Sequence, residues 1–207
     1  MERMAAYHYL IELWADSDMG NNITIGSLSE LANDTPMPGS GSTSKRQSIK
    51  LDKIGPRGGR GGGVRDVQVP PYRLLRLEIH SKYTINGISF SYIGSDGSVH
   101  HESWGGGGKY VPYTGRDGIV FEEYPIQLGL TDYVKEISGT TGAYTDHPNI
   151  VRSLKVVTFK RTYGPYGATD GAGSPFSFPV QGSARITGFF GRSGDYLDSI
   201  GVYIREC

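Results

Sequence analysis

The chain has 207 residues, and its 21 lysines and arginines balance 21 aspartates and glutamates, which gives a formal charge of zero. This balance argues against a dedicated binder of nucleic acid or of a membrane surface, because the affinity of such proteins rests on a basic excess. No run of about 18 apolar residues occurs, so we expect no transmembrane helix and no membrane insertion.

Residues 1–48 differ in composition from the rest of the chain. Residues 5–14 have an apolar face at helical spacing, formed by Tyr7, Leu10, Ile11 and Trp14. Residues 36–47, PMPGSGSTSKRQ, have the composition of a flexible linker. We therefore predict an N-terminal extension over residues 1–48 that is mostly flexible and contains one short helix. A docking helix for a protein partner is the alternative interpretation.

The cysteine content bears on the cellular compartment. Cys207 is the single cysteine, so it cannot form an internal disulfide. The amino terminus also lacks a basic segment followed by an apolar run, which is the pattern of a secretory signal. Both observations favour a reducing compartment, and we expect a cytoplasmic or nucleocytoplasmic location.

From residue 49 onward the sequence predicts strand after strand. Leu75, Leu77 and Ile79 alternate with the polar residues Arg76, Glu78 and His80. Ile200, Val202 and Ile204 alternate in the same way with Gly201, Tyr203 and Arg205. This is the period of a half-buried strand. No segment after residue 50 keeps a helical period over 11 residues. The fold class is therefore all-β, with a sandwich, a barrel or a prism as the candidates. Glycine clusters at 58–63, 105–108 and 188–194 favour a pseudo-symmetric design.

Residues 186–204 carry the strongest functional signal. Two apolar strands flank a glycine-rich turn, and Asp198 stands at the start of the second strand. A carboxylate can accept from two adjacent sugar hydroxyls while main-chain amides bind the remaining sugar oxygens. Gly191 and Gly194 are expected to supply backbone angles that other residues avoid. The spacing of Gly194 and Asp198 is weak evidence by itself, since composition predicts roughly two Gly-x-x-x-Asp pairs by chance.

Several segments together resemble the jacalin-related lectins, and in particular their mannose-binding branch in plants. The resemblance rests on five strings: Lys53-Ile54-Gly55-Pro56, Trp104-Gly105-Gly106-Gly107-Gly108, Glu136-Ile137-Ser138-Gly139-Thr140, Gly164-Pro165-Tyr166-Gly167 and the terminal GFFGRSGDYLDSIGVYI. It implies a lectin domain over residues 49–207. The implied fold is a β-prism of three four-stranded Greek-key sheets around a pseudo-threefold axis.

The resemblance also implies one sugar site, at the end of the prism where the first and last loops meet. Its residues would be Gly62, Gly194, Asp195, Tyr196, Leu197 and Asp198. Asp198 would accept from two sugar hydroxyls, and the amides of Gly62, Asp195 and Tyr196 would donate to sugar oxygens. The implied ligands are glycans that contain mannose or glucose, because Gly62 lies within a continuous chain, whereas galactose-binding relatives are cleaved at this glycine. No metal and no cofactor are implied.

Two further loops are weaker candidates for sugar sites. Gly142 and Asp146 have the right spacing, but we expect their loop to be displaced from the corresponding strand start. In the 82–86 loop Lys82 replaces the glycine, and Asn86 offers one carbonyl oxygen in place of a carboxylate. We predict that neither loop binds sugar. Arg57 and Arg60 form tandem RGG units, a weak sign of RNA binding on a neutral chain.

Catalysis is not expected from any constellation in the sequence. His100, His101 and Glu102 are adjacent on a predicted strand and so point to opposite faces. Glu122 and Glu123 fail as a glycosidase pair for the same reason.

The alternative to a lectin is a protein-interaction module, which has a vestigial sugar site and recruits its partner through residues 1–48. Cross-linking of glycans by one site per chain would require a homo-oligomer.

Overall fold

A computed structural model of the chain describes residues 50–106, 122–168, 170–171 and 173–206. Twelve strands account for most of this part of the chain, and it contains no α-helix. None of the described residues forms a helix of the length and apolarity that crossing a bilayer would need. The predicted extension over residues 1–48 and Cys207 lie outside the described residues, so the domain boundary at residue 49 stays a prediction.

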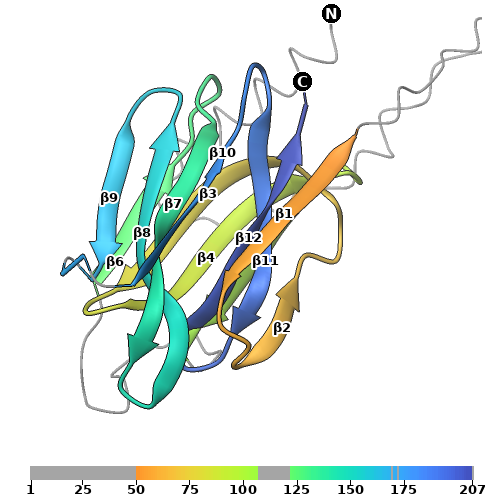
Figure 1. Cartoon of the computed structure of the whole chain (residues 1–207). Helices are drawn as coiled ribbons and strands as arrows, with labels where there is room; N and C mark the ends of the chain where they lie inside the picture. The colour runs from red at the N-terminus through yellow and green to blue at the C-terminus, as the bar shows by residue number, and fades with distance from the viewer. Residues whose placement is uncertain (1–49, 107–121, 169, 172, 207) are drawn as a thin grey trace, which may run out of the picture. The chain divides into compact units, whose positions relative to one another are not determined.

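The first group of strands combines the two ends of the domain (Figure 1). Its members are β1 (Leu51–Gly58), β2 (Gly63–Asp66), β11 (Arg185–Ser193) and β12 (Leu197–Arg205). All neighbouring strands are antiparallel, in the order β2-β11-β12-β1. The first and last loops of the domain therefore lie in the same four-stranded unit.

The second group is continuous in sequence. It consists of β3 (Pro71–Ser81), β4 (Ile85–Gly94), β5 (Val99–Gly105) and β6 (Glu122–Gln127). The strands pair in the order β6-β3-β4-β5. Three consecutive strands are thus followed by a fourth that returns to the side of the first, which defines a Greek key.

The third group repeats this connectivity. It contains β7 (Val134–Tyr144), β8 (His147–Thr158), β9 (Thr162–Gly167) and β10 (Ser174–Pro179). Their order is β10-β7-β8-β9, and one residue pair, Ile186 with Val134, joins this group to the first. The first group has the same spatial order when its strands are counted from β11 through β12 and β1 to β2, because it joins the two ends of the domain. The predicted β-prism of three four-stranded Greek-key sheets is confirmed.

Apolar side chains from all three groups meet in one core. On β3, Leu77 and Ile79 are at most 2% exposed, as their alternation with polar residues predicted. The ring of Phe90 lies edge-on to Trp104 within its own sheet and to Phe189 of the first sheet, with centroids 4.9 and 5.1 Å away. Edge-to-face pairs add about 0.5–1.5 kcal/mol each to the energy of burial. Because the core packs the three sheets against one another, it sets the positions of the strand ends and of the loops that join them.

Strand β12 differs from the half-buried strand that its sequence predicted. It is buried on both faces from Leu197 to Ile204. A side chain at Gly201 would collide with the ring of Phe190, so this ring occupies the space over the glycine. Tyr203 packs edge-on to the same ring at 5.7 Å. The face of β12 that carries Gly201 and Tyr203 is therefore covered by the aromatic ring of β11 and is not exposed to solvent.

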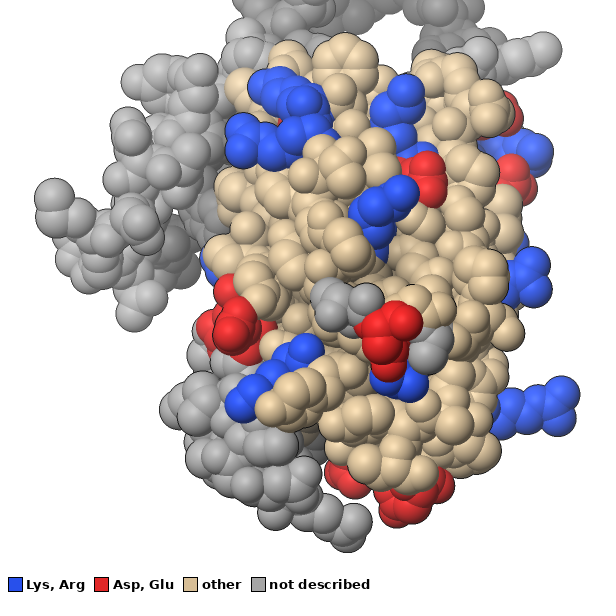
Figure 2. Space-filling model, turned by 60° about the vertical axis from the view of Figure 1, so that its left-hand side comes forward, with Lys and Arg blue, Asp and Glu red and all other residues tan. Residues whose placement is uncertain are grey.

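Charged residues of both signs are spread over the surface. On the face shown in Figure 2, groups of basic and acidic side chains are separated by uncharged surface and do not form one continuous basic area. This distribution agrees with the formal charge of zero.

Candidate functional site

The β1–β2 loop and the β11–β12 turn approach each other closely. The Cα of Gly62 lies 3.3 Å from the position that a Cβ at Gly194 would occupy. A Cβ at Gly62 would in turn lie 2.5 Å from both the Gly194 amide nitrogen and Asp198 Oδ2. The structure therefore brings together Gly62, Gly194 and Asp198, which sequence reasoning assigned to one site.

The two glycines are required for different reasons. Gly62 has a φ of +56°, in the left-handed region that side chains disfavour. Gly194 has no such φ, nor has Gly191, so the expectation of unusual backbone angles at these two positions is wrong. A residue larger than glycine is disfavoured at position 194 by lack of space, because its side chain would contact the backbone of Gly62 too closely.

Asp198 is the second residue of β12 and is only 3% exposed. Its own carbonyl accepts from the Gly59 amide at 2.8 Å, which ties the β1–β2 loop to the strand. Burial raises the pKa of the Asp198 carboxyl, while His147, the Gly194 amide and Arg192 oppose this shift. The carboxylate is thus largely removed from water before a ligand arrives, on a strand whose backbone is tied to the β1–β2 loop.

The raised pKa predicts a dependence of sugar binding on pH. Only the ionised carboxylate accepts from two hydroxyls, so protonation of Asp198 should weaken binding. Because its pKa is raised, affinity should begin to fall at a pH above the ordinary aspartate value of about 3.9. Calorimetry over a pH series in which the chain stays folded measures the effect. An affinity that stays constant down to the ordinary value would contradict the role of the carboxylate, and the His147→Gln variant checks that the nearby imidazole is not the cause.

Arg192 holds the β1–β2 loop in place. Its guanidinium donates from Nε to the carbonyl of Gly61 at 2.8 Å and from Nη2 to the carbonyl of Gly62 at 2.7 Å. A side chain at Gly61 would collide with Asp198 Oδ1. Sequence reasoning missed both residues as parts of the site. Both lie in the glycine clusters that the sequence singled out, but their contacts depend on how the two loops are apposed.

The turn between β7 and β8 forms a neighbouring wall of the site. The Tyr196 ring lies edge-on to His147 at 4.9 Å and to Tyr144 at 5.6 Å between centroids. Sequence reasoning missed these two aromatic residues, because nothing local in the sequence shows that the third sheet reaches the last loop. They restrict how a ligand can approach Tyr196.

The remaining predicted site residues differ in what they can offer. Asp195 is exposed and Tyr196 is half-buried, so both lie at the surface of the turn. The Leu197 side chain is completely buried and belongs to the core. Leu197 can therefore contribute only main-chain groups to the site.

The two weaker candidate loops occupy different positions relative to Asp198. Asn86 is the second residue of β4, as Asp198 is of β12, and its buried Oδ1 accepts no hydrogen bond. Asp146 precedes β8 and is 81% exposed, so it does not occupy the corresponding position. The loop between β5 and β6 lies partly outside the described residues. Whether either place binds sugar stays a prediction.

The histidines and glutamates that the sequence offered as catalytic groups contact different partners and do not come together in one site. His100 lies 3.1 Å from the Asp96 carboxylate, on a different sheet from Asp198. Glu122 accepts from the hydroxyl of Tyr124, whereas Glu123 is paired in register with His80 of β3. The two glutamates therefore do not face a common cleft.

Comparison with known proteins identifies the family. A family model described as the jacalin-like lectin domain matches residues 54–203. The chain belongs to the jacalin-like lectin family. This confirms the resemblance that the five sequence strings indicated.

Three similar proteins show how far the likeness to other jacalin-like lectins extends. Horcolin from Hordeum vulgare is 44% identical over 156 residues, which are 73% of this chain and 95% of horcolin. A mannose/glucose-specific lectin from Parkia platycephala is 34% identical over 153 residues, 73% of this chain and 31% of that protein. The solved structure of AcmJRL, a mannose-binding jacalin-related lectin from Ananas comosus, is 35% identical, with a TM-score of 0.65 over 76% of this chain and 99% of its own.

Proposed function

We propose that this chain is a lectin without catalytic activity that binds mannose- and glucose-type sugars through one metal-independent site. The observation that carries the proposal is the buried carboxylate of Asp198, which lies against Gly61, Gly62 and Gly194 where the first and last loops of the domain meet. Folding has already removed most water from this carboxylate, so sugar binding does not have to supply the free energy of that desolvation and needs little reorganisation of the site.

The proposed recognition combines one charged acceptor with main-chain donors. Asp198 accepts from two adjacent hydroxyls of the sugar, and hydrogen bonds of this kind are about twice as strong as those between neutral groups. The amides of Asp195 and Tyr196 donate to the ring oxygen and the neighbouring hydroxyl, and the amide of Gly62 donates to the far side of the ring. Leu197 supports the turn from below through its buried side chain.

We expect methyl α-mannoside to bind with a dissociation constant of about 0.1 to 10 mM, and methyl α-galactoside much more weakly. The preference for mannose rests on the named specificities of the Parkia and Ananas lectins and on the continuous chain around Gly62. Isothermal calorimetry with the two methyl glycosides measures the difference. Equal or tighter binding of the galactoside would refute the proposed specificity.

Removal of metal ions should leave mannoside binding unchanged. A calcium site needs six to eight oxygen ligands, and no cluster of three potential metal ligands forms around Asp198 among the described residues. Titrations of the same sample before and after treatment with EDTA test this expectation. Loss of binding that added calcium restores would show that the site needs a cation.

The alternative of a protein-interaction module with a vestigial sugar site has no supporting observation among the described residues. Its proposed docking segment, residues 1–48, lies outside them.

We propose a cytoplasmic or nucleocytoplasmic location on the basis of the single cysteine. Agglutination by one site per chain would require a homo-oligomer.

A further inference from the structure

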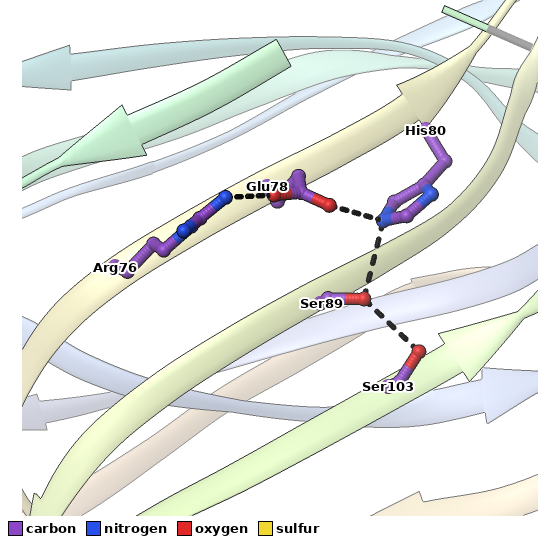
Figure 3. Close-up of polar contacts among 5 residues, drawn as sticks. All are labelled: Arg76, Glu78, His80, Ser89 and Ser103. Atoms are coloured by element: carbon purple, nitrogen blue, oxygen red, sulfur yellow. Dashed lines mark hydrogen bonds and ion pairs between the residues drawn. The ribbon is translucent and has the colours of Figure 1, made fainter. Parts of the chain in front are cut away.

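The outer face of the second sheet has a row of polar side chains that the sugar site does not use. Arg76, Glu78 and His80 follow one another at every second position of β3, so they project to the same side (Figure 3). Their neighbours Leu77 and Ile79 point into the core. The row lies on a different sheet from Asp198.

Glu78 is the buried member of this row. It is 5% exposed, and its two carboxylate oxygens have different partners. Arg76 donates to Oε2, while Oε1 lies 3.3 Å from Nε2 of His80. The carboxylate is therefore fixed by the guanidinium, and its second oxygen faces the imidazole.

A third potential ligand comes from the neighbouring strand. Glu123 of β6 stands opposite His80 in the register of the sheet. One ligand atom from each of Glu78, His80 and Glu123 lies within 4.8 Å of the other two. Glu123 is exposed at the edge of the sheet, so its side chain is free to move towards the other two.

We propose that Glu78, His80 and Glu123 bind a divalent transition-metal ion, with Zn²⁺ as the best fit. Zinc takes nitrogen and oxygen ligands at about 2.0–2.1 Å in a tetrahedral arrangement, which separates two ligand atoms by about 3.3 Å. The distance between Glu78 Oε1 and His80 Nε2 already has this value. Glu123 supplies the third ligand after a small side-chain rotation, and water completes the tetrahedron.

The residues around the three ligands fit this role. Ligating carboxylates and imidazoles are usually oriented by further hydrogen bonds, and Arg76 provides such a bond to Glu78. In the free protein His80 Nε2 lies 3.1 Å from Ser89 Oγ, which in turn is 3.0 Å from Ser103 Oγ, so an ion at Nε2 replaces the contact with Ser89. When Nε2 binds the ion, the imidazole proton resides on Nδ1, and the Ser89 hydroxyl keeps its hydrogen bond with Ser103.

The charges of the site favour a dication. The two carboxylates contribute two negative charges, and Arg76 already compensates one of them in the free protein. A divalent ion is then held mainly by the second carboxylate and the neutral imidazole, so we expect weaker binding than at structural zinc sites with thiolates. The hard ions calcium and magnesium prefer oxygen ligands alone, so the imidazole selects against them.

The test is a titration of the full chain with Zn²⁺, followed by calorimetry and by NMR of the imidazole nitrogens of its five histidines. We expect saturable binding of one ion per chain and a large shift of the His80 signals. His80→Gln and Glu123→Gln should each weaken binding by at least about tenfold, because loss of even an outer partner of a metal ligand costs about ten- to a hundredfold in affinity. Thermal unfolding of each variant shows whether it is folded.

His100→Gln is the matched control. His100 also lies 3.1 Å from a carboxylate, that of Asp96, but no third ligand joins this pair among the described residues. This variant should bind zinc as the original chain does. The proposal is overturned if the folded chain shows no saturable binding below about 1 mM Zn²⁺, or if both ligand variants bind as the original chain does. The result does not depend on sugar binding, because the readout is the ion itself.

Discussion

The Asp198→Asn variant is expected to bind methyl α-mannoside about ten- to a hundredfold more weakly than the original chain. The substitution keeps the shape of the side chain, but it removes the negative charge and replaces one acceptor by an NH₂ donor. Hydrogen bonds to charged groups contribute about 1.5–3 kcal/mol, which corresponds to this loss of affinity. Calorimetry of the two proteins measures it directly.

The same substitution should not destabilise the fold at neutral pH. Burial raises the pKa of Asp198 above its value in the unfolded chain, so folding favours the protonated form. As the pH rises from the unfolded pKa through the folded pKa, ionisation of Asp198 therefore lowers the free energy of unfolding. Neutral asparagine avoids this cost. Asp52→Asn removes a half-exposed carboxylate of β1 and serves as the control. If Asp198→Asn is folded and binds mannoside normally, the site is assigned to the wrong residue.

The Gly62→Ala variant is expected to lose at least about tenfold in mannoside affinity and about 1–3 kcal/mol in the free energy of unfolding, the usual scale of local backbone strain. Alanine is disfavoured at a φ of +56°. Its Cβ would also lie 2.5 Å from Asp198 Oδ2, so the carboxylate or the loop must move. Mannoside titration and thermal unfolding give the two values separately.

Gly63→Ala is the matched control for this prediction. Gly63 adjoins Gly62 in the chain, but a Cβ there would have its nearest neighbour, the carbonyl oxygen of Ser193, 4.0 Å away. We expect a change in stability within about 0.5 kcal/mol and unchanged affinity. Equal effects of the two alanines would mean that the close approach of Gly62 to Asp198 is not what shapes the site.

The fold could be predicted from the sequence because two kinds of signal agreed. Alternation on β3 identified its inner residues Leu77 and Ile79, and the resemblance supplied the order of the strands. Alternation failed on β12, since Phe190 covers Gly201 from a neighbouring strand. A local pattern reports that one face is apolar, but it does not report what covers the other face.

The candidate site was predictable where it is local and not where it depends on distant segments. Asp198 and Gly194 lie in one turn, and the resemblance added Gly62. The contributions of Arg192 and His147 depend on how loops from different parts of the chain are apposed. At Gly194 the sequence predicted a special backbone angle, whereas the structure shows a limit of space.

The cluster on the second sheet shows the same limit. Alternation placed Glu78 and His80 on one face of a strand, but their third neighbour could not be found from spacing. Glu123 is 43 residues from His80 along the chain, and only the register between β3 and β6 brings the two together. Cross-strand neighbours of this kind require a known sheet order.

A crystal structure of the chain with methyl α-mannoside tests the central claim most directly. We predict one sugar bound where the first and last loops meet, with two of its hydroxyls within hydrogen-bond distance of the Asp198 carboxylate and its ring against Gly62. A sugar bound elsewhere, such as at Asn86 or at the turn with Asp146, and not at Asp198 would contradict the account.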